Sequence, residues 1–203
     1  MIVHPPTADE VEGHAAQMYA DDVNADGFVY QYTQAMAINP DAHAAFQALM
    51  RAVVPSIGIR TFELATLGAA RAIPSPHCLL AHGRKMLRAG GMGEEQLARV
   101  GRDYEDAGLS DADIAVMTYA ERLSTDPAAM TDDDTRALRE VGFSDRQIVD
   151  ITLAAAVRNY FSRALLALAV PIDQVPGITP DLADALLTPC GTGLDAASRT
   201  ADA

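Results

Sequence analysis

The sequence has few of the residues that mark β-rich, disulfide-rich or membrane proteins. It contains no tryptophan, and aromatic residues make up only 5% of its 203 residues. It has no apolar run of the roughly 18 residues that a membrane-spanning helix needs, so no such helix is expected. Its two cysteines, Cys78 and Cys190, are too few for a disulfide framework. We therefore expect a reducing, cytoplasmic setting.

Positive charge is also scarce. The chain has 15 Lys and Arg against 28 Asp and Glu, a formal net charge of −13, and Lys85 is its only lysine. Such a chain would be repelled by nucleic acid and by anionic lipid, so we expect neither as a partner. The first residues, MIVHPPTADEVEG, lack the basic and apolar regions of a secretory signal peptide.

What the chain does have is alanine and helical patterning. Hydrophobic residues make up 49% of the chain, and its length suits one domain with a well-buried core. Abundant alanine with few aromatic residues favours close-packed helices over a sheet. We predict a single all-α domain of about eight to ten helices over residues 1–173, followed by a partly irregular or disordered C-terminal tail, 174–203.

Local patterns place several helix boundaries. A helix that begins after Asn39 is expected to end at residues 55–58, and the next is expected at 60–72. Ser110, Thr131 and Ser144 are predicted N-caps, the last forming a capping box with Gln147. The longest apolar segment, 148–170, follows that box, and we expect it to be the central core helix.

Residues 62–82, FELATLGAARAIPSPHCLLAH, gather a carboxylate, a thiol and two imidazoles. Ser75 and Pro76 are typical of an N-cap and a first helical residue. Cys78 would then lie in the first turn, where unpaired N–H groups and the helix dipole favour a thiolate. His82, four residues on, shares its helix face. Glu63 is the only acid in the preceding apolar helix, so these groups predict a proton relay that activates sulfur.

Each of these residues also has a purely structural interpretation. Cys78 could be a small buried apolar residue, and His82 a core histidine bonded to a carbonyl group. Glu63 could face solvent or pair with Arg60 or Arg71. These alternatives stay open at the level of sequence.

Two neighbouring residues are candidates for supporting roles. His77 precedes Cys78 and points away from it on a helix, so a structural role, a subunit contact and a catalytic role are all open. Ser75 is explained by its N-cap position alone. His77 and His82 lie about 140° apart around the helix and do not converge on a metal, so neither a metal nor another cofactor is expected.

The order and spacing of Glu63, His77, Cys78 and His82 resemble the active-site region of the alkyl hydroperoxidase D-like (AhpD-like), or carboxymuconolactone decarboxylase, family. Residues 109–170 resemble the second half of its peroxidase-related branch. The chain departs from the family at Ser75, where redox-active members have their first cysteine. The resemblance implies an AhpD-like helical bundle that forms a homo-oligomer, with the site in a small cavity near a subunit contact.

The first functional hypothesis is a thiol oxidoreductase that reduces a peroxide with one reactive cysteine. Cys78 would attack a peroxide oxygen, His82 would accept the thiol proton, and Glu63 would orient His82. Because Ser75 cannot close a disulfide, an external thiol reductant would resolve the sulfenic acid, unless Cys190 does so from the tail. Cys190 could equally be an incidental thiol.

Two other hypotheses are compatible with the sequence. The first is a carboxymuconolactone decarboxylase-like lyase, in which His82 and Glu63 do acid–base chemistry on a small carboxylated lactone. Arg71 or Arg158 could bind its carboxylate. The second is a helical oligomer that kept the fold and lost the chemistry, in which Cys78 would be sealed in a dry site.

Overall fold

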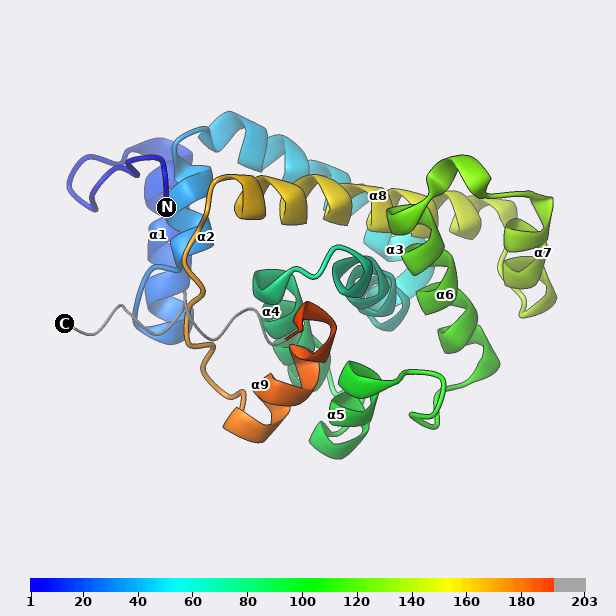
Figure 1. Ribbon diagram of the computed structural model, residues 1–203. Helices are drawn as coiled ribbons and strands as arrows, with labels where there is room; N and C mark the ends of the chain where they lie inside the picture. Colours follow the sequence, from blue (N-terminus) through cyan, green and yellow to red (C-terminus); the bar gives the residue numbers. More distant parts are fainter. Residues whose placement is uncertain (192–203) are drawn as a thin grey trace.

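The computed structural model describes residues 1–191 and consists of helices joined by short turns (Figure 1). The α-helices are α1 (Gly13–Asp26), α2 (Gln31–Ala37), α3 (Pro40–Ala72), α4 (Pro76–Arg88), α5 (Glu94–Arg102), α6 (Asp111–Thr125), α7 (Asp132–Glu140), α8 (Asp145–Ala167) and α9 (Pro180–Leu186). Two short 3₁₀ helices are η1 (Pro127–Ala129) and η2 (Thr188–Cys190). With nine α-helices and no strand among the described residues, the predicted all-α class is confirmed.

The segment predicted as a tail contains regular structure up to residue 191. Helices α9 and η2 lie there, and both pack against α5. The rest of that prediction, residues 192–203, lies outside the described residues. Within residues 1–191, no helix has both the length and the apolar character needed to cross a bilayer.

Short polar motifs fix several helix starts. Ser110, Thr131 and Ser144 cap α6, α7 and α8, and each belongs to a capping box in which the third helical residue bonds back to the cap. These N-caps were predicted from the sequence and are confirmed. They leave few first-turn amides without a partner, which fixes where each helix begins.

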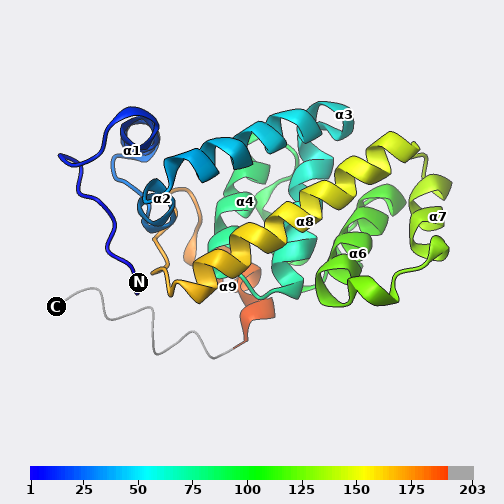
Figure 2. The same cartoon turned by 90° about the horizontal axis from the view of Figure 1, so that it is seen from above.

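Helix α3 contains a kink where the sequence predicted a helix end. The chain continues through Pro55, and only Gly58, with φ 75° and ψ 161°, leaves helical geometry. A residue with a side chain rarely adopts that φ, so glycine allows the change of direction. The first half of α3 lies beside α8, and the second half turns into the middle of the molecule (Figures 1 and 2).

The second half of α3 is the central helix, so the prediction that residues 148–170 would take that place is wrong. Leu64, Ala65, Ala69 and Ala70 are fully buried, and α4, α6 and α8 pack around this segment. Helix α8 instead has a solvent-facing side with exposed apolar residues, among them Val149, Leu153 and Tyr160. A helix buried on every side needs apolar residues all round, which the leucines and alanines of this segment supply.

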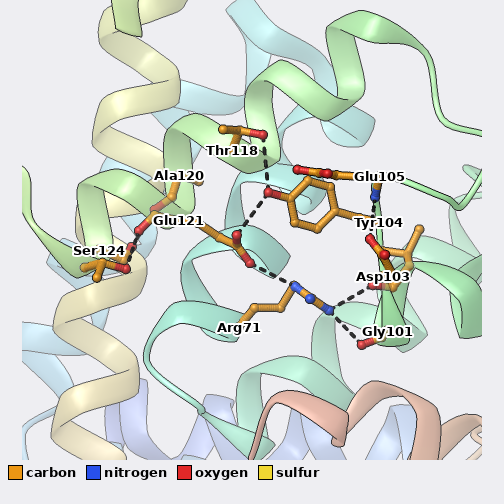
Figure 3. Close-up of polar contacts among 11 residues, drawn as sticks. Arg71, Gly101, Asp103, Tyr104, Glu105, Thr118, Ala120, Glu121 and Ser124 are labelled. Carbon is orange, nitrogen blue, oxygen red and sulfur yellow. Dashed lines mark hydrogen bonds and ion pairs between the residues drawn. The ribbon is translucent and has the colours of Figure 1, made fainter. Parts of the chain in front are cut away.

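Arg71 ties the central helix to two neighbours (Figure 3). Its Nε donates to Glu121 Oε1 of α6 at 3.0 Å, and its Nη1 donates to the carbonyl oxygen of Gly101 in α5 at 2.7 Å. Tyr104 donates from its hydroxyl to Glu121 Oε2 at 3.0 Å. Arg71 is therefore held in a structural network that excludes both earlier suggestions for it, a pair with Glu63 and a substrate clamp.

Gly68 marks the closest approach of α3 to α6, and this contact gives a stability prediction. A Cβ atom built on Gly68 would lie 2.7 Å from the carbonyl oxygen of Met117 and 3.2 Å from Ala120 Cβ. Because backbone cannot yield as a side chain can, Gly68→Ala is expected to lower the free energy of unfolding by about 2 kcal/mol. Urea unfolding monitored by circular dichroism measures this change.

Gly93→Ala is the matched control, because a Cβ atom there meets no atom within 4 Å. It should cost at most about 1 kcal/mol, the loss of a fair N-cap residue. Equal costs at the two glycines would contradict the close helix–helix contact.

Candidate active site

Cys78 lies in the first turn of α4, where the sequence placed it, with its sulfur facing α8. Ser162 Oγ donates a hydrogen bond to Cys78 Sγ at 3.1 Å, and Arg158 Nη1 donates another at 3.5 Å. All three side chains are buried. A hydroxyl and a guanidinium directed at one sulfur stabilise negative charge on it.

Glu63 and His82 form a buried pair between α3 and α4. Glu63 Oε2 and His82 Nδ1 are 2.5 Å apart, and the two residues are 1% and 3% exposed. The predicted proximity of the carboxylate and the imidazole is therefore present in the structure. Such a bond fixes the ring tautomer, with hydrogen on Nδ1 and the lone pair on Nε2.

Burial sets the charge state of this pair. Burial, together with the nearby Arg158 guanidinium, lowers the pKa of His82 to about 3. Burial alone would raise the pKa of Glu63, but His82, Lys85 and Arg158 together hold it below its usual range. At neutral pH the pair is thus an ionised carboxylate that accepts from a neutral imidazole.

The thiol and the imidazole share a cavity but are not bonded to each other among the described residues. Cys78 Sγ bonds to Ser162 and Arg158, and His82 bonds to Glu63. The expected direct transfer of the thiol proton to His82 therefore has no hydrogen bond to follow. The sulfur and the imidazole both line the cavity, and a molecule in the cavity could contact both of them.

This cavity has a volume of about 540 Å³ and lies between α1, α2, α3, α4 and α8. Its apolar wall includes Tyr32, Phe46, Met50, Phe62, Phe161 and Leu165. Helix α1 covers one side, held to α4 by the Arg84–Asp26 ion pair and to α3 by His14 Nε2, 3.1 Å from His43 Nδ1. The volume suits a small ligand.

The two residues predicted to support the site, His77 and Ser75, differ in their surroundings. His77 lines the cavity, donates from Nε2 to the Pro171 carbonyl oxygen at 2.9 Å, and has a pKa lowered by burial. Ser75 precedes α4 as predicted, but its side chain makes no capping bond and its Oγ is buried without a partner among the described residues. Its ψ is 98°, whereas the caps at Ser110 and Ser144 have ψ of 158° and 162°.

Sequence reasoning missed three residues of this site. Ser162 was considered only as one of residues 109–170, which resemble the family's peroxidase-related branch. Arg158 was considered only as a possible partner of a substrate carboxylate, and Lys85 only as the single lysine of the chain. Arg158 and Ser162 are four residues apart on α8, so they share a face, and this spacing is the one sequence feature that links them. The pairing of α8 with Cys78 is visible only in the fold.

Cys190 lies apart from the cavity. It belongs to η2, which packs against α5 and the end of α3, and it is half-buried with a pKa raised by burial to about 11. It is not among the residues that line the cavity. Its position in the described chain therefore gives no support to the idea that it resolves a sulfenic acid at Cys78.

The described residues contain no group of three or more His, Cys, Asp and Glu side chains that could hold a metal ion. Of the possible ligands that line the cavity, Glu63 and His82 are bonded to each other.

Comparison with known proteins identifies the fold. No family model matches the chain, and no curated protein matches it in sequence. Among solved structures, it is similar to a peroxidase-related protein with an alkylhydroperoxidase AhpD core from Ralstonia eutropha JMP134. The identity is 21%, the TM-score is 0.75, and 85% of this chain and 92% of that chain are covered. A peroxidase-related protein from Silicibacter sp. TM1040 is 22% identical, with a TM-score of 0.74 over 85% of this chain and 91% of that one.

A further similar structure is the debrominase Bmp8, solved as a cysteine-to-alanine variant with 2,3,4-tribromopyrrole. It is 17% identical, with a TM-score of 0.71 over 93% of this chain and 97% of that one. Together these likenesses confirm the AhpD-like helical fold that the motif around Cys78 predicted.

The buried histidine makes stability depend on pH. The pKa of His82 falls from 6.5 in an unfolded chain to about 3 here, so between these values the unfolded chain binds more protons than the folded one. The stability is thus fully present above pH 6.5 and is lost as the pH falls, by up to about 1.4 kcal/mol per pH unit. In His82→Gln this part of the slope is expected to vanish, as measured by urea unfolding from roughly pH 7 to 4.

His4→Gln, at an exposed histidine of the N-terminal segment, is the control and should keep the wild-type slope. A wild-type slope in His82→Gln as well would mean that His82 is not held neutral by burial.

Proposed function

We propose that the protein is a one-cysteine thiol oxidoreductase that reduces a peroxide or a similarly electrophilic small molecule at Cys78. The observation that carries the proposal is the arrangement around one cavity. The sulfur of Cys78 is held there by Arg158 and Ser162, and the Glu63–His82 pair lines the same cavity.

Arg158 and Ser162 give the sulfur its nucleophilic character. A thiolate is the reactive form of cysteine, and a buried guanidinium at 3.5 Å favours that form through its charge. Ser162 adds a hydrogen bond at 3.1 Å, and the first turn of α4 adds its dipole. Three separate features thus favour negative charge at one atom.

The Glu63–His82 pair supplies proton transfer. With Nδ1–H bonded to Glu63, the His82 ring has its lone pair on Nε2, and a neutral ring is able to accept a proton. Since sulfur and ring are not bonded directly, the proton passes through the substrate oxygen or a water molecule in the cavity. The carboxylate stabilises the imidazolium that forms.

The reaction balances as follows. The thiolate attacks one peroxide oxygen, the O–O bond breaks, and the leaving alkoxide or hydroxide takes a proton from the relay, so that sulfur becomes a sulfenic acid. An external thiol condenses with that sulfenic acid, releasing water and forming a mixed disulfide. A second thiol then releases the Cys78 thiolate. Ser75 stands where a resolving cysteine would, and its hydroxyl cannot form a disulfide.

Reductive debromination is a second candidate, favoured by the likeness to Bmp8 over 93% of this chain. The thiolate of Cys78 can take bromine from an electron-rich ring as a sulfenyl bromide, and the relay then protonates the ring carbon. Two external thiols return the sulfur to its thiolate, with bromide as the leaving ion. In both candidate reactions the same residues act, the Cys78 sulfur is oxidised by two electrons, and external thiols reduce it again.

The arrangement favours these candidates over the two other hypotheses from the sequence. A lyase has no use for a sulfur to which Arg158 and Ser162 donate, and a sealed, dry site does not fit a cysteine that lines a cavity. Self-association and a cytoplasmic setting stay predictions of the sequence.

Thiol chemistry at Cys78 gives the central test. After treatment with hydrogen peroxide, a dimedone adduct is expected on Cys78 and not on Cys190, as measured by peptide mass spectrometry. Peroxide consumption with dithiothreitol should disappear in Cys78→Ser and fall on the order of a hundredfold in His82→Gln and in Glu63→Gln. The reason is that these variants lose the nucleophile and the relay, respectively.

Cys190→Ser is the matched control and should retain wild-type turnover. Peroxide turnover that survives Cys78→Ser would overturn the proposal, because the reaction would then not use the sulfur.

The second candidate is tested separately. Incubation with 2,3,4-tribromopyrrole and dithiothreitol should release bromide, detected by ion chromatography, in wild type but not in Cys78→Ser. Bromide release at the same rate from both proteins would show that the reaction does not use the cysteine.

A further inference from the structure

We infer that the cavity at Cys78 binds a small organic anion with a flat apolar body, a carboxylate or an acidic phenol, through Arg158 and Lys85. The inference rests on the proposed function only in taking Cys78 as the reacting residue, because binding of the anion itself does not need the thiol. It names the class of substrate that the cavity would accept.

The first observation is a buried guanidinium without a carboxylate. Arg158 is 3% exposed, its only hydrogen bond within residues 1–191 goes to Cys78, and its Nε is buried without a partner. The other buried arginine, Arg84, pairs with Asp26, and the half-buried Arg60 and Arg71 pair with Asp113 and Glu121. In so acidic a chain, a buried arginine left without an acid is a vacant anion site, because burying an unpaired charge is costly.

The second observation is a further cation on the same cavity. Lys85, which is exposed to solvent, lines it as well. Lys85 makes no ion pair with another described residue. Its charge and that of Arg158 both lower the pKa of Glu63, which lines the same cavity.

The charges that line the cavity do not balance. Arg158 and Lys85 are cationic, His82 is neutral, and the one carboxylate, Glu63, is already bonded to His82. Together these four groups carry one net positive charge, which a thiolate at Cys78 neutralises and a protonated thiol leaves unmatched. When the thiol is protonated, an anionic ligand supplies the missing negative charge.

The remaining walls define the body of that ligand. Tyr32, Phe46, Phe62 and Phe161 provide aromatic surface, which suits a ring or a short apolar chain in about 540 Å³. The other lining acids, Asp21 and Asp22, belong to α1. Asp22 accepts from the backbone N–H of Tyr30, and burial raises its pKa, which reduces its repulsion of an anion.

Isothermal titration calorimetry at constant ionic strength tests the inference with matched probes. Benzoate and 4-nitrophenolate carry the charge, and benzamide has the shape of benzoate without it. Benzoate or 4-nitrophenolate is expected to bind, and benzamide at least tenfold more weakly. Arg158→Met and Lys85→Met should each weaken binding of the anion on the order of tenfold.

Arg102→Met is the charge control, because it removes one exposed positive charge on α5, away from the cavity, and should leave binding unchanged. If Arg158→Met fails to fold, Lys85→Met, at a solvent-accessible position, carries the test. Equal binding of benzamide and benzoate, binding of neither anion, or anion binding untouched by Lys85→Met would overturn the inference.

Cys78→Ala separates this inference from the proposed function. Anion binding should persist in that variant, because the sulfur is not part of the anion site. Anion binding without any thiol chemistry at Cys78 would support the anion site and contradict the proposed oxidoreductase. Peroxide reduction at Cys78 without anion binding would support the oxidoreductase and contradict the anion site.

Discussion

The buried hydrogen bond between Glu63 and His82 is the interaction on which the candidate site depends. Two ionisable side chains that are 1% and 3% exposed must satisfy each other, because the apolar interior offers them nothing else. The bond joins the central helix, α3, to α4, and it thereby sets how the first turn of α4 faces the cavity. The same burial keeps the imidazole neutral, so a structural requirement also makes the ring a proton acceptor.

Helix α8 supplies the remaining polar side chains of the candidate site that α3 and α4 form. Its inner face places Arg158 and Ser162 on Cys78, and its outer face exposes apolar residues to solvent. Of the two buried arginines, only Arg158 lacks a carboxylate within residues 1–191, whereas structural arginines such as Arg71 have one. This contrast separates a guanidinium that supports the fold from one that is free to act on sulfur or on a ligand.

The place of Cys78 in the first turn of α4 and the shared helix face of Cys78 and His82 could be predicted, because an N-cap followed by proline and an i, i+4 relation are local features. Glu63 lies 19 residues before His82, and it was predicted as a partner because it is the only acid in an apolar stretch. The capping bond of Ser75 was predicted in the same way and is absent, since its Oγ is buried without a partner among the described residues. The kink at Gly58 was expected as an end, since sequence shows that a helix is interrupted but not that it resumes.

The sequence by itself determined the all-α class, the main helix starts and four of the residues around the cavity, Glu63, His77, Cys78 and His82, because helix periodicity and capping act over a few neighbouring residues. Only the tertiary structure decided that the second half of α3 is central and that α8 lies against Cys78. It also decided that Arg71 is committed to Glu121 while Arg158 is not. Those outcomes depend on which helices pack together, and packing is decided by the whole set of buried surfaces rather than by any one segment.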